Sequence, residues 1–140
     1  MDRQCYALNS DLELVEKHPS PFVVARLDFK TLGDRITFTE AIAYNEYSRL
    51  LAPVYIVEAQ AYPRDFVASE PDAHKFNIYR YNSGDWRPEP AIVDKTLLKE
   101  GVSWAELHEW EKALRNHRKQ EMGRKRIKDA SPMFAEVEVI

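Results

Sequence analysis

The sequence predicts an α/β or α+β fold, in which a mixed central sheet with a ββαβ core is followed by a long C-terminal helix. Three observations predict it. Two segments of strand-forming residues flank a proline-containing turn at residues 18–21, a segment of helix formers follows at residues 39–51, and a continuous apolar run begins after Pro53. The clearest helix start in the chain lies much later, at Ser103.

The size and composition of the chain predict one soluble domain. It has 140 residues, and a hydrophobic content of 44% is enough to build one core. We therefore expect a single domain over residues 1–140, with a basic helix end at residues 115–128 and a C-terminal tail at residues 129–140. The first residues lack the apolar block of a signal peptide, and no stretch reaches the roughly 18 apolar residues that cross a bilayer. We expect a cytoplasmic protein that makes no contact with membranes.

The composition argues against several classes of site. The chain has a single cysteine, Cys5, and its four histidines never approach one another at metal-ligand spacing. An internal disulfide and a zinc site are therefore not expected. A third interpretation is an unrelated α/β domain with a small-molecule pocket. No Gly-rich phosphate loop, nucleophile elbow or Rossmann fingerprint supports this interpretation.

The N-terminal half is predicted to form the ββαβ unit. Residues 12–16 alternate between apolar and polar types, and residues 22–29 are rich in β-formers, so both are predicted strands joined by a turn. Residues 39–51 contain neither Gly nor Pro and have apolar residues near helical spacing. Residues 54–57 are continuously apolar, as in strands buried on both faces of a parallel sheet. A strand, a helix and a strand in this order predict a right-handed crossover.

The turn at residues 18–21 also predicts which residues face one another across the hairpin. It pairs Lys17 with Phe22, and the pairing continues along both strands. The opposed pairs then include Asp11 with Asp28 and Glu13 with Arg26. Because side chains alternate along a strand, Asp11, Glu13, Arg26, Asp28 and Lys30 share one face, and Leu12, Leu14, Ala25, Leu27 and Phe29 share the other. One face is predicted to be core and the other charged.

Two carboxylates on one face need a compensating cation. Asp11 and Asp28, placed directly opposite each other, repel by roughly 0.2–1 kcal/mol. Lys30 is one candidate for the compensating charge, and a hard divalent ion such as Mg²⁺ is another, since it binds one or two carboxylates and keeps several waters. The alternative is that both aspartates lie in water at the strand ends, with Glu13 and Arg26 as an ordinary cross-strand pair.

The order of these residues resembles the PD-(D/E)XK nuclease superfamily, whose fold is the restriction-endonuclease-like fold. The resemblance covers residues 9–58: an aspartate opens one strand, Asp28-Phe29-Lys30 ends the next, and a helix and a buried strand follow. It implies that Asp11 and Asp28 hold Mg²⁺ or Mn²⁺ and that Lys30 orients or activates the attacking water. Glu40 and Tyr44 have the spacing of a Gln-x-x-x-Tyr pair found in some branches, with Glu in place of Gln. The N-terminal core helix of the family has no counterpart, because only ten residues precede Asp11; a short strand at residues 4–8 would fit there.

The C-terminal half is predicted to contain a hairpin and a helix. Residues 76–81 alternate as a strand that ends in a turn, and residues 86–93, which contain two prolines, return beside it as an edge or irregular segment. A capping box at Ser103 and Glu106, with Val102 and Leu107 as its hydrophobic staple, starts a helix that should reach residue 121 and end at Gly123. Residues 134–140 alternate weakly and are expected to add an edge strand or to contact a partner.

Basic charge is concentrated near the end of the chain. Residues 115–128 have seven basic residues against one acidic residue, Glu121, in a chain whose net charge is -3. Such a segment either binds phosphate backbones or is a solvated helix end, where cations also favour the helix dipole. The candidate nucleic-acid-binding residues are Arg115, Arg118, Lys119, Arg124, Lys125, Arg126 and Lys128.

Two functions from different classes follow from these patterns. The first is a metal-dependent nuclease-like protein that hydrolyses or binds DNA phosphodiesters, with Mg²⁺ or Mn²⁺ as cofactor and residues 134–140 as the contact of a homodimer. The second is a non-catalytic protein-interaction module that keeps the fold and uses aromatic residues such as Tyr79, Tyr81 and Trp86 to bind a partner. Nuclease activity requires Asp11, Asp28 and Lys30 to converge, whereas an interaction module does not.

Overall fold

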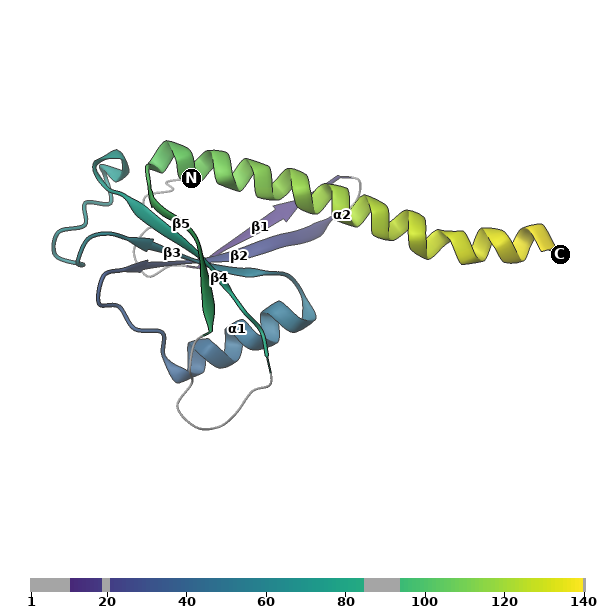
Figure 1. Cartoon of the computed structure of the whole chain (residues 1–140), viewed down its shortest axis with the longest axis horizontal. Helices are drawn as coiled ribbons and strands as arrows, with labels where there is room; N and C mark the ends of the chain where they lie inside the picture. The colour runs from purple at the N-terminus through teal and green to yellow at the C-terminus, as the bar shows by residue number, and fades with distance from the viewer. Residues whose placement is uncertain (1–10, 19–20, 85–93, 140) are drawn as a thin grey trace.

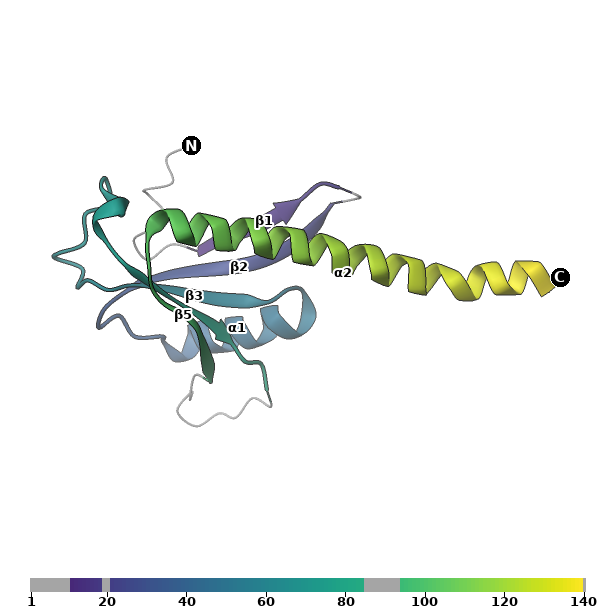
Figure 2. The ribbon, with the colours of Figure 1, turned by 45° about the horizontal axis from the view of Figure 1, so that its top comes forward.

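A five-stranded mixed sheet lies between two helices (Figure 1). The computed structural model describes residues 11–18, 21–84 and 94–139, without the side chains of Asp11 and residues 125–139. α1 covers one face of the sheet, and α2 lies along the other (Figures 1 and 2). In chain order the elements are β1 (Asp11–Glu16), β2 (Phe22–Thr31), α1 (Phe38–Leu50), β3 (Val54–Ala59), a 3-10 turn η2 (Pro71–Ala73), β4 (Phe76–Tyr81), β5 (Lys95–Val102) and α2 (Trp104–Val139).

The strands lie in sequence order, β1-β2-β3-β4-β5. β2 and β3 are parallel and are joined by α1, while the other three neighbouring pairs are antiparallel. The predicted ββαβ core and its crossover are therefore confirmed. Because a parallel pair needs a crossover helix, α1 is held against the sheet beside the carboxyl ends of β2 and β3.

The register of the first hairpin agrees with the prediction over most of its length. Asp11 pairs with Asp28, and Glu13 pairs with Arg26. An irregularity between Leu14 and Val15 then shifts the pairing by one residue, so Phe22 pairs with Glu16 and the predicted partner Lys17 is wrong. Such an irregularity adds one residue to one strand, and sequence alternation does not reveal it.

Each face of the sheet has its own apolar cluster. On the α2 side the predicted core residues Leu14, Ala25, Leu27 and Phe29 are buried with Val57, Phe76, Ile78 and Leu107, among others. On the α1 side a smaller cluster is formed by Tyr44, Val54 and Ile56. The second face is therefore charged on β1 and β2, whereas on β3 it is apolar at Val54 and Ile56, which pack with Tyr44 of α1.

Capping boxes start both helices. Ser103 Oγ accepts a hydrogen bond from the Glu106 amide at 3.1 Å, and Glu106 Oε1 accepts one from the Ser103 amide at 3.2 Å. The staple residues Val102 and Leu107 are buried in the same cluster, so the predicted start of α2 is confirmed. Thr37 and Glu40 form an equivalent box at the start of α1, which the sequence analysis did not identify.

Two C-terminal predictions are wrong. α2 does not end at Gly123 but runs through it and through Pro132 to Val139, so residues 134–139 are helical rather than an edge strand. Gly123 lacks the positive φ of a helix-ending glycine, and a helical glycine costs only about 1 kcal/mol.

The strand β5 was not predicted, and the expected return at residues 86–93 falls outside the described residues. In the part of the chain that the structure describes, no helix is long and apolar enough to cross a membrane.

Ion pairs attach α2 to the first hairpin. Arg115 donates to the Val15 carbonyl at 3.0 Å and pairs with Glu16 at 3.3 Å. Arg118 donates to the Val24 carbonyl at 3.1 Å, and Lys119 lies 3.5 Å from Glu16. Beyond these contacts the last part of α2 extends past the sheet (Figures 1 and 2).

Leu107 is expected to anchor α2 to the sheet. The Leu107→Ala variant should lower the free energy of unfolding by about 2–5 kcal/mol, because a buried leucine leaves a cavity when it is truncated. Urea denaturation measures this change. The matched control is Leu50→Ala, since Leu50 is 76% exposed, and its effect should stay within about 0.5 kcal/mol. Equal effects of the two variants would contradict the packing of α2 described above.

Candidate functional site

The candidate site lies toward the carboxyl end of β2, on the face that α1 covers. Asp28 and Lys30 are two residues apart and therefore point to the same side of the sheet. Both are nearly fully buried, with exposures of 2% and 6%. Buried charges are costly unless they are paired, so their neighbours decide whether this site is stable.

Lys30 contacts two carboxylates. Its Nζ atom donates to Glu40 Oε2 at 2.6 Å and lies 3.6 Å from Asp28 Oδ2. The Tyr44 hydroxyl donates to the same oxygen of Glu40 at 3.4 Å. The structure thus brings together Asp28, Lys30, Glu40 and Tyr44, four of the five candidate catalytic residues.

Glu40 has two structural functions. Its Oε1 atom accepts a hydrogen bond from the Thr37 amide at 3.1 Å, which completes the capping box of α1, while its Oε2 atom binds Lys30. A glutamine could also cap the helix, but it would leave the ammonium group of Lys30 with less compensating charge. This contact gives a physical reason for Glu at the position where the resemblance has Gln.

The charges of this cluster stabilise one another. Burial alone would lower the pKa of Lys30, but the hydrogen bond to Glu40 and the charges of Asp28, Glu40 and Asp34 outweigh it and raise the pKa above its ordinary value. Burial would raise the pKa of Glu40, but the hydrogen bonds from Lys30 and Thr37 and the charge of Lys30 lower it. Lys30 is therefore a cation and Glu40 an anion at neutral pH.

Asp11 is the fifth candidate catalytic residue. Its backbone lies directly opposite Asp28 in the β1-β2 register, and its side chain is outside the described part of the chain. Within the described residues, no group of three or more His, Cys, Asp or Glu side chains is placed to hold a metal ion. Mg²⁺, however, needs only one or two protein carboxylates. Asp28 together with Asp11 would supply that number of carboxylates, since the two residues are paired in the register.

Two further carboxylates lie close to Lys30 and were missed by the sequence analysis. Glu58 is the direct neighbour of Lys30 across the parallel β2-β3 pair, so both side chains lie on the same face. Asp34 follows β2, and its Oδ2 atom is buried with no hydrogen-bond partner among the described residues. Glu58 could have been found from the sequence, because it is an acidic residue directly after the apolar run at residues 54–57. No sequence pattern indicated Asp34.

Tyr47 of α1 contacts both members of the predicted pair, Glu13 and Arg26. The two residues face each other in the register, and the Tyr47 hydroxyl of α1 donates to Glu13 Oε2 at 2.8 Å. The Arg26 guanidinium lies over the Tyr47 ring, 5.4 Å from its centroid. Burial and the charge of Glu13 raise the pKa of Tyr47 far above its ordinary value. This part of the face attaches α1 to the sheet.

The predicted nucleic-acid-binding residues divide into two groups. Arg115, Arg118 and Lys119 bind the first hairpin, as described above, and the side chain of Arg118 is only 15% exposed. Arg124 is exposed. The side chains of Lys125, Arg126 and Lys128 lie outside the description. At least three of the seven cations therefore help to hold α2 in place.

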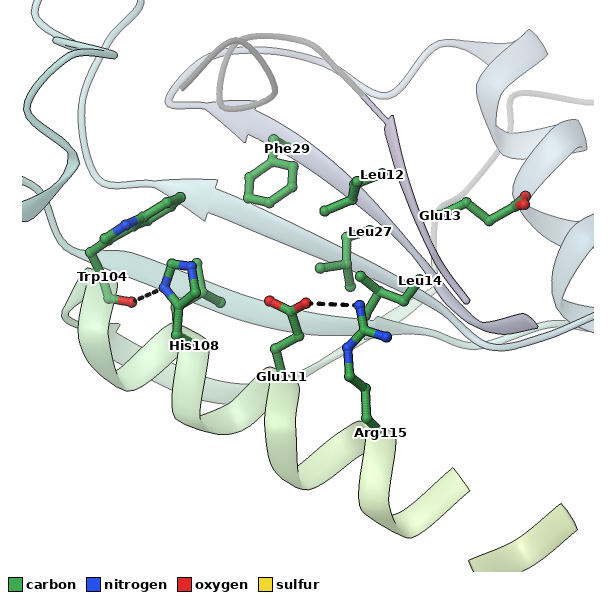
Figure 3. A pocket seen from close by; sticks show the side chains of 10 residues that line it. Leu12, Glu13, Leu14, Leu27, Phe29, Trp104, His108, Glu111 and Arg115 are labelled. Carbon is green, nitrogen blue, oxygen red and sulfur yellow. Dashed lines mark hydrogen bonds and ion pairs between the residues drawn. The ribbon is translucent and has the colours of Figure 1, made fainter. Parts of the chain in front are cut away.

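A small cavity lies on the opposite face of the sheet. It has a volume of about 180 Å³ between β1, β2 and α2. Figure 3 shows Leu12, Leu14, Leu27 and Phe29 facing His108, Glu111 and Arg115 of α2, with Glu111 bound to Arg115. Its volume is below the range of about 300–1,000 Å³ typical of ligand pockets, and the sheet separates it from Lys30.

Comparisons with known proteins add no further identification. The chain matches no protein-family model, no curated protein and no solved structure.

We expect the Lys30-Glu40 pair to make folding pH-dependent. The lowered pKa of Glu40 stabilises the fold fully at pH values above the ordinary glutamate pKa of 4.5, and this stabilisation is lost as the pH falls through the folded-state pKa. At pH 7, Glu40→Gln should reduce the free energy of unfolding by about 1.5–3 kcal/mol, since it removes a charged hydrogen bond. The difference between wild type and variant should shrink as the pH falls below about 4.5. Urea denaturation from pH 3 to 7 measures it, and a constant difference over that range would refute this assignment.

Proposed function

We propose that this chain is a metal-dependent nuclease-like protein that hydrolyses or binds DNA phosphodiesters, related to the PD-(D/E)XK superfamily. The observation that carries the proposal is the contact of Lys30 with both Asp28 and Glu40, with Tyr44 bound to Glu40. Asp28 and Lys30 match the motif positions of the resemblance, and Glu40 and Tyr44 match its spacing with Glu in place of Gln. The four residues meet on one face of the sheet toward the carboxyl end of β2.

In this proposal Asp28 and Asp11 are the metal ligands. Carboxylate oxygens are the donors that Mg²⁺ and Mn²⁺ prefer, and the carboxylates around Lys30 outnumber its single positive charge. The excess of negative charge on a buried face favours binding of a cation. When bound, the ion lowers the pKa of a coordinated water and offsets negative charge that develops on the phosphate.

Lys30 acts as a cation rather than as a general base. A general base at neutral pH needs a pKa near 7, whereas the surroundings of Lys30 raise its pKa above the ordinary value. Its ammonium group can orient a water molecule and stabilise a phosphate oxygen by hydrogen bonding. Glu40 and Tyr44 are positioning residues, because they hold the ammonium group at one place on β2.

Substitutions should separate metal binding by Asp28 from the contribution of Lys30 to cleavage. Asp28→Asn should abolish binding of Mn²⁺ in calorimetry and reduce cleavage of plasmid DNA by at least about 100-fold. Lys30→Met should retain metal binding but lose cleavage to a similar extent. Glu109→Gln, an exposed change on α2, is the control and should behave as the wild type. A wild-type protein that binds no Mn²⁺ would remove the catalytic proposal.

A non-catalytic protein-interaction module is the second candidate function. A hollow of about 640 Å³ lies where α2 leaves the sheet, and its lining includes Phe22, Val23, Leu51 and Met122. Leu50 and Leu51, at the end of α1, are 76% and 54% exposed. Exposed apolar patches of this kind mark protein-binding surfaces, so this function is favoured if metal binding fails.

The basic residues of α2 should divide into stabilising and DNA-binding groups. Arg124→Ala should weaken DNA binding, lower the slope of log affinity against log salt by about 1, and leave stability within about 0.5 kcal/mol of the wild type. Arg118→Ala should instead lower the free energy of unfolding by about 1.5–3 kcal/mol, because it removes charged hydrogen bonds to Val24 and Glu121. Fluorescence anisotropy at several salt concentrations and urea denaturation measure the two effects. An unchanged salt slope for Arg124→Ala would leave the basic segment without a role in DNA binding.

A homodimer through residues 134–140 stays a prediction, and residues 134–139 belong to the projecting end of α2 rather than to an edge strand. The side chains of these residues are outside the description, so the contact is tested by light scattering of the wild type and of a truncation after Glu121. A monomeric wild type would remove it.

A further inference from the structure

Two loops meet beside the candidate site, at the carboxyl ends of the parallel strands. The loop after β2 and the segment after β3 are joined by a hydrogen bond of 2.9 Å from the Leu32 amide to the Ala61 carbonyl. The ring of Tyr62 lies against Gly33, where a Cβ atom would be 3.5 Å from Tyr62 Cε1. Gly33 has a φ of 81°, which favours glycine at this position. In open α/β sheets, ligands bind at this edge.

The Tyr62 ring is presented to solvent by an anchored loop. Its side chain is 52% exposed, while its carbonyl accepts hydrogen bonds from the amides of Asp65 at 2.9 Å and Phe66 at 3.0 Å. Phe66 is buried and stacks on His74 at 4.7 Å, and His74 Nε2 accepts a hydrogen bond from the Val67 amide. The loop is therefore held by the core, so binding a ligand on Tyr62 orders little additional chain.

An arginine lies beside the exposed ring. The Arg64 guanidinium lies 5.8 Å from the centroid of the Tyr62 ring, and its side chain is 83% exposed. The ion pair of Arg64 with Asp65 is exposed and 3.8 Å long, so it contributes little and can be exchanged for another anion. Arg35 is exposed on the other loop. Gly33 lies in the turn that directly follows β2, three residues after Lys30.

We infer that Tyr62 stacks on an unpaired base of a single DNA strand and that Arg64 contacts the adjoining phosphate, next to the proposed hydrolytic site. The inference deepens the proposed function and rests on it for the identity of the ligand. An exposed aromatic ring beside arginine is the combination that single-strand binding uses, because every base has a face that can stack. In a duplex these faces are already stacked, so the ring selects unpaired nucleotides. Tyr62 and Arg64 thereby make the protein specific for strands with an unpaired end, gap or branch.

The test is binding of a fluorescein-labelled 12-nucleotide single strand, measured by anisotropy with Ca²⁺ in place of Mg²⁺. Tyr62→Ala should weaken binding by about 5- to 150-fold, the range that corresponds to loss of one base stack. Tyr62→Phe keeps the ring and should bind within about twofold of the wild type. A duplex of the same sequence should bind the wild type and Tyr62→Ala within about twofold of each other.

Charge controls complete the experiment. Arg64→Ala should weaken single-strand binding and reduce its salt dependence, whereas Arg49→Ala, an exposed arginine in the last turn of α1, should change neither. Single-strand binding that Tyr62→Ala leaves unchanged, or that Tyr62→Phe weakens as much as Tyr62→Ala, overturns the inference. So does a wild type that binds no single strand.

The outcome separates this inference from the proposed function. Single-strand binding that depends on Tyr62, in a protein that never cleaves DNA with Mg²⁺, supports the binding site and removes the nuclease activity. Cleavage that depends on Asp28 but not on Tyr62, with unchanged binding by Tyr62→Ala, keeps the nuclease activity and overturns the base-stacking site.

Discussion

The ion pair between Lys30 and Glu40 is the interaction on which the functional face depends. It neutralises an ammonium group that is almost completely buried on β2, and the second oxygen of the same carboxylate caps the start of α1. Loss of the Glu40 side chain would therefore leave a buried charge poorly compensated and would remove one of the two hydrogen bonds of the α1 capping box. One side chain thus sets both the position of α1 and the chemistry of the strand beneath it.

The two faces of the sheet differ in the kinds of residue they bury. The α2 face contains most of the apolar core, and ion pairs from Arg115 and Lys119 to Glu16 hold the helix on it. The α1 face contains the charged residues and only a small apolar cluster. The stability that the larger core supplies allows the second face to bury a lysine and an aspartate, which an isolated hairpin could not do.

The loops that contain the proposed DNA-binding residues meet where the two parallel strands end. The hydrogen bond from Leu32 to Ala61 and the contact of Gly33 with Tyr62 join the two loops beyond Lys30. Charged groups from β2, β3 and α1 meet just before this point, and exposed aromatic and basic side chains lie just beyond it.

The sequence by itself determined the local elements, and the tertiary structure decided which of them meet. Alternation and turn residues predicted that Asp28 and Lys30 share a face, and the capping box predicted the start of α2, since both depend on neighbours a few residues away. Glu58 beside Lys30 and Tyr62 against Gly33 depend on the register of a parallel pair and on loop packing, which no short pattern encodes. The shift at Val15 was missed because the pairing of two strands is not encoded in either strand alone. α2 continues through Gly123 because a glycine inside a helix costs only about 1 kcal/mol, which is not enough to end it.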